Sequence, residues 1–326
     1  MRLNKSTSYV LLYLLVGGKK GSGISKLMPG VDIRSIQRAL TRLVELRIVN
    51  RSGPRNNPSY SVSYDKLLVT EIPTRLLEDE NRPETRFNHG LVNWLNSKQN
   101  DLDKIIATPN NLASKKRMTA KELEYLTIEL SWKSSALEGN TYTLLDTQLL
   151  LTEGIKAKNR TEFETQMILN HKEVIKFIIE NPELFNNKIR FSTVEELHKL
   201  IAFNLGIEKG LRKKLVKISA SNYVPLANPH QLREYADVVL DIINKPLNPV
   251  TRSLFVLTLI PYLQLFEDGN KRTGRMLANA ILISSIGRGF SLRKVSAKEL
   301  ALAYLAFYEF NSMSALSRIL DSEINT

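Results

Sequence analysis

The sequence predicts a mainly α-helical protein with a small α+β domain at its N-terminus. Apolar residues recur at helical spacing through most of residues 119–326, whereas strand-like alternation is confined to short stretches before residue 73. The 326 residues are 43% apolar and 24% charged, an ordinary globular composition that excludes a disordered or fibrous protein. The length suffices for two domains of common size.

Basic residues are concentrated near the N-terminus. The chain has 46 Lys and Arg against 33 Asp and Glu, a net charge of +13, and residues 1–60 contribute +9 of it. This distribution favours an anionic partner for the N-terminal part. The absence of cysteine excludes disulfides, thiolate metal sites and thiol nucleophiles.

The apolar run from Tyr9 to Val16 is the one segment that could pass for an export signal. No small-residue cleavage pattern follows it, and Lys19 and Lys20 come next, so we interpret it as a buried helix. No apolar run approaches the roughly 20 residues needed to span a bilayer. We therefore expect a cytoplasmic protein with no membrane association.

Residues 1–65 begin with a helix-turn-helix pattern. Helices are expected at Ser6 to Val16 and at Ile24 to Met28, and Gly30-Val31 is expected to form a turn. Asp32 is placed to cap a third helix, in which apolar residues recur at spacings of 3, 4 and 3. The opposite face of this third helix is basic and polar, so one side is predicted to pack and the other to be exposed.

A hairpin is predicted to follow the third helix. Residues 50–58 are rich in turn-forming side chains and carry two arginines, and Tyr60, Val62 and Tyr64 then alternate with serines. Residues 1–65 thereby resemble a winged helix-turn-helix domain, in which the third helix enters the DNA major groove and the wing contacts phosphates. The resemblance implies DNA-binding residues at Arg34, Arg38, Arg42, Arg51 and Arg55. Such domains also serve as protein-binding or dimerisation modules, so a protein partner or a homodimer is the alternative.

Residues 66–118 are expected to connect and pack the flanking regions. They are predicted to hold, in order, a short strand at Leu67 to Ile72, the breakers Pro73 and Pro83, a helix around Trp94, and the basic linker Lys115-Lys116-Arg117. A capping box formed by Thr119 and Glu122 then opens the helical region 119–326. The sequence thus predicts three regions: 1–65, 66–118 and 119–326.

The segment from Gln264 to Arg275 is a polar turn between two apolar helices, expected at Leu254 to Leu263 and at Met276 to Ile283. Backbone N–H groups at the start of the second helix, with two arginines one turn apart, would form a cradle for phosphates. Asp268 is placed to hold Mg²⁺ between two phosphate groups. The alternative is a connecting turn whose aspartate caps the helix and whose arginines pair with surface acids.

The order of residues in this turn resembles the motif of the Fic family, His-x-Phe-x-(Asp/Glu)-Gly-Asn-(Gly/Lys)-Arg-x-x-Arg. The resemblance implies a Fic-type helical core with a β-hairpin flap. It also implies an enzyme that uses ATP and Mg²⁺ to move AMP onto a Tyr, Ser or Thr hydroxyl of a protein target. The residues it implies for nucleotide binding are Phe266, Asp268, Gly269, Asn270, Lys271, Arg272 and Arg275, with Asp268 also binding the metal.

A second match lies upstream, at Ser134, Glu138 and Gly139. It resembles the inhibitory motif of the same family, (Ser/Thr)-x-x-x-Glu-(Gly/Asn), borne on a helix that precedes the core. The resemblance implies that Glu138 forms a charge-assisted pair with Arg275 and obstructs the γ-phosphate.

Residues 210–225 resemble the hairpin flap of the family, which clamps a protein target as an added strand. An ordinary edge hairpin is the alternative. His171 and His198 fall in positions where the family's helices carry histidines, and we expect both to be structural.

The chain departs from the family at the first motif position, where Gln264 replaces the histidine that acts as general base. A glutamine amide cannot take up a proton near neutral pH, and general-base help is typically worth ~10²–10⁴ in rate. Leu265 in place of proline is a milder change. Of the four histidines, His230 alone is placed to substitute, because it follows the flap.

Three interpretations remain. The protein is a nucleotide-binding relative of AMP transferases with weak or lost activity, or a DNA-binding regulator whose core senses nucleotide or holds a partner. Both could hold at once. In the third interpretation the enzyme is active and uses a target carboxylate, which needs no base, or another diphosphate-containing donor.

Overall fold

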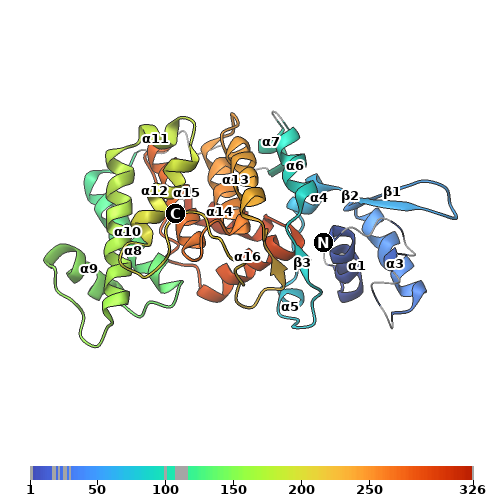
Figure 1. The fold of residues 1–326 in the computed structure, drawn as a ribbon, viewed down its shortest axis with the longest axis horizontal. Coiled ribbons are helices and arrows are strands. Elements are labelled where there is room, and N and C mark those ends of the chain that lie inside the picture. The colour runs from blue at the N-terminus through green and yellow to red at the C-terminus, as the bar shows by residue number, and fades with distance from the viewer. Residues whose placement is uncertain are drawn as a thin grey trace. The chain divides into compact units, whose positions relative to one another are not determined.

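The computed structural model describes residues 3–16, 20, 23–24, 28, 31–98, 101–106 and 117–324. Helices take up 61% of the described residues, which confirms the predicted mainly α fold. By compactness the chain divides into two units. Figure 1 labels the helices and strands along the chain. Unit 1 comprises Met1–Ser97, Lys217–Pro225 and Ala301–Ala315, and unit 2 comprises Lys98–Val216, Leu226–Leu300 and Leu316–Thr326. The three regions predicted from the sequence, 1–65, 66–118 and 119–326, do not coincide with these two units. Their boundaries stay a prediction.

Unit 1 begins with α1 (Lys5–Leu15) and continues to α3 (Ile33–Glu45). The Asp32 carboxylate caps α3 by accepting a hydrogen bond from a first-turn amide at 3.2 Å, as its position predicts. Of the four apolar residues predicted for its inner face, Ile36, Leu40 and Leu43 are buried, together with Ala39. The prediction is wrong for Ile33, which starts the helix and is 59% exposed. Most of the helix expected at Ile24 to Met28, and Gly30 of the expected turn, lie outside the described residues.

A hairpin follows α3. Strands β1 (Val49–Ser52) and β2 (Ser59–Val62) pair antiparallel, as the alternating side chains predict. The strand expected at Leu67 to Ile72 is wrong, because its first two residues end a short helix, α4 (Tyr64–Leu68). A short apolar run fits a buried strand and one face of a short helix equally well. The other short helices of unit 1 are α5 (Thr74–Leu77) and α6 (His89–Ser97), and α6 contains Trp94 as expected.

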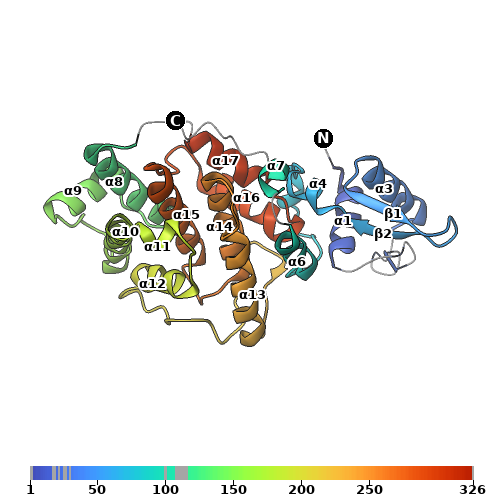
Figure 2. The same ribbon diagram turned by 90° about the horizontal axis from the view of Figure 1, so that it is seen from above.

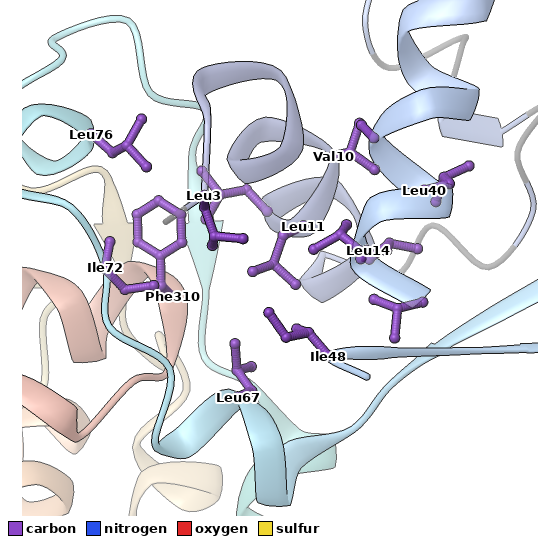
Figure 3. Close-up of a cluster of buried hydrophobic side chains, with 14 of the residues drawn as sticks. Leu3, Val10, Leu11, Leu14, Leu40, Ile48, Leu67, Ile72, Leu76 and Phe310 are labelled. Atoms are coloured by element: carbon purple, nitrogen blue, oxygen red, sulfur yellow. The ribbon is translucent and has the colours of Figure 1, made fainter. Parts of the chain in front are cut away.

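The hydrophobic core of unit 1 draws on segments far apart in the sequence. Leu11 of α1, Leu40 of α3 and Leu67 of α4 lie in one cluster with Phe310, which ends α16 (Ala297–Phe310) (Figure 3). All four side chains are almost completely buried. The end of α16 therefore belongs to the same packed body as the N-terminal helices.

The segment expected to form a hairpin flap adopts a different pairing. Its one strand, β4 (Tyr223–Val224), pairs in parallel with β3 (Thr85–Arg86). Residues 210–225 are all described and contain no second strand, so the expected hairpin is not formed. Local sequence pattern predicts the extended backbone here but does not predict its partner, which lies more than a hundred residues earlier in the chain.

A buried ion pair holds the chain next to β4. Arg82 Nε lies 2.5 Å from Glu309 Oε2, and neither side chain is appreciably exposed. Glu309 Oε1 also accepts hydrogen bonds from the Ser221 hydroxyl and the Asn222 amide, each at 3.0 Å. Arg82 donates in turn to the carbonyl oxygen of Ala220 at 3.1 Å. Charged partners inside unit 1 therefore fix the stretch that precedes β4.

The secondary-structure elements in the described residues of unit 2 are all helices, joined by loops. Its helices are α7 (Leu102–Ile106), α8 (Ala120–Ala136), α9 (Leu144–Glu153), α10 (Glu162–Glu180), α11 (Glu183–Asn186), α12 (Phe191–Ile201), α13 (Pro229–Ile243), α14 (Pro249–Leu263), α15 (Asn270–Ile286) and most of α17 (Ser314–Ile324). Helix α15 packs against α10, α11, α12 and α14 (Figure 2). Helix α14 is buried on all sides, as expected of a helix without a polar face.

Two further predictions concern helix ends and membranes. Helix α8 begins with the predicted capping box, because Thr119 and Glu122 each accept a bond from the other's amide. Lys115 and Lys116 of the expected basic linker lie outside the described residues. Within the described part of the chain, we find no helix long and apolar enough to cross a membrane. The cytoplasmic location stays a prediction.

Candidate functional site

The polar turn lies between the end of α14 and the start of α15. Gly269 precedes α15 in the left-handed conformation, with φ of 79°, which a glycine adopts without steric cost. Gln264 follows α14 with φ of 50°, also in the left-handed region. Residues other than glycine rarely take this conformation, and those that do are often found at functional sites. The left-handed residues Gln264 and Gly269 thus mark the two ends of the turn between α14 and α15.

Asn270 holds this turn closed. Its Oδ1 accepts the amide of Phe266 at 2.9 Å, and its Nδ2 donates to the carbonyl oxygen of Phe266 at 2.8 Å and to Gln264 Oε1 at 3.2 Å. Gln264 Nε2 donates to the carbonyl oxygen of Pro261 at 2.7 Å, so both ends of the Gln264 amide are engaged. Only 7% of Gln264 is exposed. The side chain at the position of the family histidine is therefore bound within the turn.

His198 of α12 contacts the turn at two residues, Phe266 and Asp268. Its ring stacks on Phe266, with centroids 3.7 Å apart, and its Nε2 donates to the carbonyl oxygen of Asp268 at 3.0 Å. Burial lowers the pKa of His198 to about 4, so the ring is neutral at neutral pH. Phe266 is completely buried, and its side chain supports the turn through packing. These contacts agree with the structural role expected for His198.

Arg272 and Arg275 lie one turn apart on α15 and are only 2% and 0% exposed. The Nη1 atom of each is buried and has no hydrogen-bond partner among the described residues. Leaving such a donor unpaired is costly. The first-turn amides of α15 also lack acceptors within the helix, and Lys271 lies among them. An anion at the start of α15 would supply the missing acceptors.

Glu138 lies against this cradle. Its Oε1 accepts a hydrogen bond from Arg275 Nη2 at 2.8 Å, so the structure brings together the two residues that the motifs pair. Burial by itself would raise the pKa of Glu138, but Arg275 and two neighbouring basic side chains hold it below its ordinary value. Glu138 is therefore anionic at neutral pH. Gly139 follows with φ of 92°, a conformation that glycine adopts readily at the end of a helix.

Ser134 lies in the last turn of α8, four residues before Glu138, and it also binds Arg275. Its hydroxyl accepts from Arg275 Nε and its carbonyl oxygen accepts from Arg275 Nη2, each at 3.0 Å. Two of the three residues of the upstream motif, Ser134 and Glu138, thus bind the arginine that ends the downstream motif. An anion and Glu138 would compete for that arginine.

Asp268 suits a magnesium ion only together with a ligand. Its side chain is 65% exposed, and its oxygens accept from the Gly269 amide at 2.6 Å and from Arg272 Nη2 at 2.9 Å. In the part of the chain that the structure describes, no group of three or more His, Asp or Glu side chains could hold a metal by itself. Mg²⁺ is commonly bound by one carboxylate together with phosphate oxygens and water. The donor set therefore fits Mg²⁺ when phosphates complete it.

Comparison with known proteins shows what the part of the chain that carries the polar turn is similar to. Residues 188–282, which include α12, α13, α14 and most of α15, match the model of the Fic/DOC family. The chain contains a Fic/DOC domain. A protein adenylyltransferase Fic from Nematostella vectensis is 24% identical over 220 residues, which cover 67% of this chain and 51% of that protein. Protein adenylyltransferase fic-1 from Caenorhabditis elegans is 23% identical over 156 residues, which cover 46% and 30%. The chain thus spans about half of the first relative and about a third of the second.

Solved structures share the fold of the chain. Fic-1 (residues 134–508) from C. elegans superposes with a TM-score of 0.55 at 15% identity, covering 99% of this chain and 97% of that one. A Fic domain-containing signalling protein from Bacteroides thetaiotaomicron gives 0.51 at 19% identity, covering 72% and 94%. At these identities the likeness shows the fold alone. Glu138 and the N-terminal basic residues lie outside the Fic/DOC match.

Arg212 is a residue of the Fic/DOC domain whose position no sequence signal reveals. It is completely buried, and its Nε donates to the carbonyl oxygen of Gln264. Its Nη1 donates to Lys214 O at 2.8 Å and its Nη2 to Leu226 O at 2.5 Å. An arginine in a lysine-rich stretch is typical of an exposed loop. Here its guanidinium ties the start of the polar turn to the chain on both sides of residues 215–225.

Outside the Fic/DOC domain, one face of α3 presents the predicted DNA-binding arginines. Three of the five, Arg34, Arg38 and Arg42, line a shallow groove on α3 together with Gln37, Thr41 and Glu45. Arg42 is paired with Glu45 at 3.1 Å, so its charge is partly neutralised. Arg51 and Arg55 are exposed on the hairpin, and Arg51 Nη2 donates to the carbonyl oxygen of Arg55 at 3.4 Å. All five arginines are open to solvent.

Two buried histidines predict how the stability of the protein depends on pH. Burial lowers the pKa of His171 to about 3 and that of His198 to about 4, from an ordinary value of 6.5. Below pH 6.5 the unfolded chain therefore takes up two protons that the folded chain does not. We expect the free energy of unfolding to fall by about 1.4 kcal/mol per pH unit for each histidine between pH 6 and pH 4.5.

Urea unfolding at pH 7.5, 6 and 4.5 measures this loss. The variant His198→Gln has one such group fewer, so its stability should fall about half as steeply over the same interval. Equal slopes for the variant and the unchanged chain would contradict the prediction.

Proposed function

We propose that this protein is a Fic-type nucleotide-binding protein related to protein adenylyltransferases, that it binds ATP with Mg²⁺, and that its transferase activity is weak or lost. The observation that carries the proposal is the pair of buried guanidinium nitrogens, on Arg272 and Arg275, that lack acceptors at the start of α15. Phosphate oxygens are the acceptors that such a site suits.

The residues of the turn divide the work of binding. The first-turn amides of α15, with Lys271, Arg272 and Arg275, would bind phosphate oxygens, and Asp268 would hold Mg²⁺ together with those oxygens. When bound, Mg²⁺ would neutralise part of the phosphate charge. Asn270 supports binding indirectly, because its amide is occupied in closing the turn.

Gln264 supports the view that transfer is weak. In AMP transfer a hydroxyl oxygen attacks the α-phosphorus, pyrophosphate leaves, and the hydroxyl proton must pass to a base. The Gln264 amide cannot accept it, and the same amide is bound to Pro261 and Asn270. His230 is exposed in the first turn of α13, and its backbone amide donates to Asn228 Oδ1 at 2.8 Å.

Glu138 would act as an inhibitor of nucleotide binding. It is anionic, it occupies a donor of Arg275, and it lies in the turn after α8, outside the Fic/DOC match. A phosphate and this carboxylate cannot use the same N–H group at once. The relatives named protein adenylyltransferases make such control of ATP binding a reasonable expectation for this chain.

Calorimetry with Mg-ATP tests the cradle. We expect Arg275→Ala to weaken ATP binding about 30-fold, because it removes charge-assisted bonds to phosphate, and Glu138→Gly to strengthen it. Arg233→Ala, which removes an exposed arginine of α13, is the matched control and should change the affinity less than twofold. ATP binding that survives Arg275→Ala unchanged would count against the phosphate cradle.

Labelling with α-labelled ATP tests the missing base. We expect the unchanged chain and Glu138→Gly to transfer little label to protein. Gln264→His combined with Glu138→Gly should transfer at least 100-fold more, because a base is restored and the lock removed. Gln264→Asn in the same background is the control and should stay inactive. Strong label on the unchanged chain would instead support transfer to a carboxylate or use of another donor.

The exposed arginines of α3 and the hairpin favour a second function, DNA binding by the winged helix-turn-helix region. The region is the most basic part of the chain, and its predicted contact face is open. In this proposal nucleotide binding in the Fic/DOC domain and DNA binding belong to one transcriptional regulator. A protein-binding or dimerisation module is the other possibility for the same face.

Binding to random duplex DNA at several salt concentrations tests this function. Each phosphate contact contributes about one to the slope of log affinity against log salt. We expect Arg34→Gln and Arg55→Gln each to lower the slope by about one. Arg75→Gln, on α5, is the matched control and should leave it unchanged. A flat salt response of the unchanged chain would favour a protein partner or a homodimer.

A further inference from the structure

Arg275 is held against α8 mainly by Ser134. Of the three bonds from the guanidinium to α8 and the turn that follows it, two go to Ser134, from Nε to the hydroxyl and from Nη2 to the carbonyl oxygen, each at 3.0 Å. The other N–H of Nη2 goes to Glu138 at 2.8 Å. The Nε edge of the guanidinium is thus fixed by Ser134, while Nη1 and half of Nη2 remain for Glu138 or for a bound anion.

The Ser134 hydroxyl needs an acceptor of its own. A guanidinium can only donate, so the Ser134 oxygen accepts from Arg275 and its proton must point elsewhere. His171 Nε2, on α10, lies 2.9 Å from the same oxygen. A hydroxyl that donates to His171 keeps its lone pairs free for Arg275.

The contacts of His171 fix the direction of this bond. Its Nδ1 lies 2.7 Å from the carbonyl oxygen of Met167, which can only accept, so Nδ1 carries the ring proton and Nε2 is bare. Nδ1 also lies 3.3 Å from the Ser135 hydroxyl, which can share the same proton. Burial, aided by the charge of Arg275, lowers the pKa of His171, which keeps the ring neutral.

We propose that His171 is a positioning residue for the nucleotide site. By accepting the Ser134 proton it makes that hydroxyl an acceptor for Arg275, and so holds the guanidinium with its Nη edge available to phosphate. The inference rests on the proposed function. Glu138 and a phosphate compete for the Nη edge, while Ser134 and His171 hold the opposite edge in both states.

This role differs from a second inhibitory contact. If Ser134 and His171 withheld Arg275 from the nucleotide, their removal would strengthen ATP binding. If they orient Arg275, their removal weakens it, because a buried arginine without a fixed edge must be ordered when the anion binds. The two roles therefore predict opposite changes in affinity.

Calorimetry with Mg-ATP on the full chain separates them, in a Glu138→Gly background that removes the competitor. We expect Ser134→Ala and His171→Leu each to weaken binding about tenfold, the worth of one charge-assisted hydrogen bond. His171→Gln supplies an amide oxygen as acceptor and should restore most of the affinity. Ser131→Ala is the matched control, because Ser131 is a buried serine on the same helix whose hydroxyl has no partner among the described residues.

A second measurement needs no variant of His171. Long-range ¹H–¹⁵N spectra of the full chain at pH 7 should show His171 as the neutral tautomer protonated at Nδ1. A proton on Nε2 would overturn the positioning role, as would unchanged or tighter ATP binding in His171→Leu. If the Glu138→Gly chain binds no ATP at all, the proposed function fails and this role with it. ATP binding together with the wrong tautomer defeats the positioning role alone.

Discussion

A guanidinium without access to solvent organises the functional part of unit 2. Burying the charge of Arg275 is costly unless its N–H groups find acceptors, so the helices around it must supply them. Ser134 of α8 and Glu138, in the turn that follows α8, supply acceptors, and α10 contributes His171 behind Ser134. The two N–H groups of Nη1 are left over, and the first-turn amides of α15 also lack acceptors within the helix. These unpaired N–H groups could donate hydrogen bonds to one anion.

The shape of the polar turn does not depend on which side chain stands at position 264. Asn270 closes the turn mainly through the backbone of Phe266, Arg212 binds the carbonyl oxygen at 264, and His198 binds that at 268. These contacts are made by the main chain or by other residues. Under the proposed function, glutamine in place of the family's histidine would lack a proton acceptor and would leave the proposed phosphate cradle in place. Loss of a base and loss of binding are separate events in this fold.

Local features of the fold could be predicted from the sequence, and distant pairings could not. The cap at Asp32 and the capping box at Thr119 act within four residues, so spacing alone reveals them. Arg272 and Arg275 share a helix face for the same reason. The partner of β4 depends on a segment more than a hundred residues away, and the burial of Arg212 depends on carbonyl oxygens that no side-chain pattern announces. The contact of Glu138 with Arg275 was foreseen through the family motifs, since spacing carries no information across 137 residues.

Glu138 is present in this chain although Gln264 stands where the family motif has its histidine base. If the cradle binds ATP as proposed, the tethered Glu138 carboxylate would compete with it at a high effective concentration and lower the apparent affinity for nucleotide. Without transfer there is no reaction for this competition to control, but occupancy of the cradle would still depend on the position of α8. A partner that displaced α8 would raise nucleotide binding, and by reciprocity bound nucleotide would favour that partner. Under the proposed function, Glu138 and the cradle would together form a nucleotide-dependent switch that does not require AMP transfer.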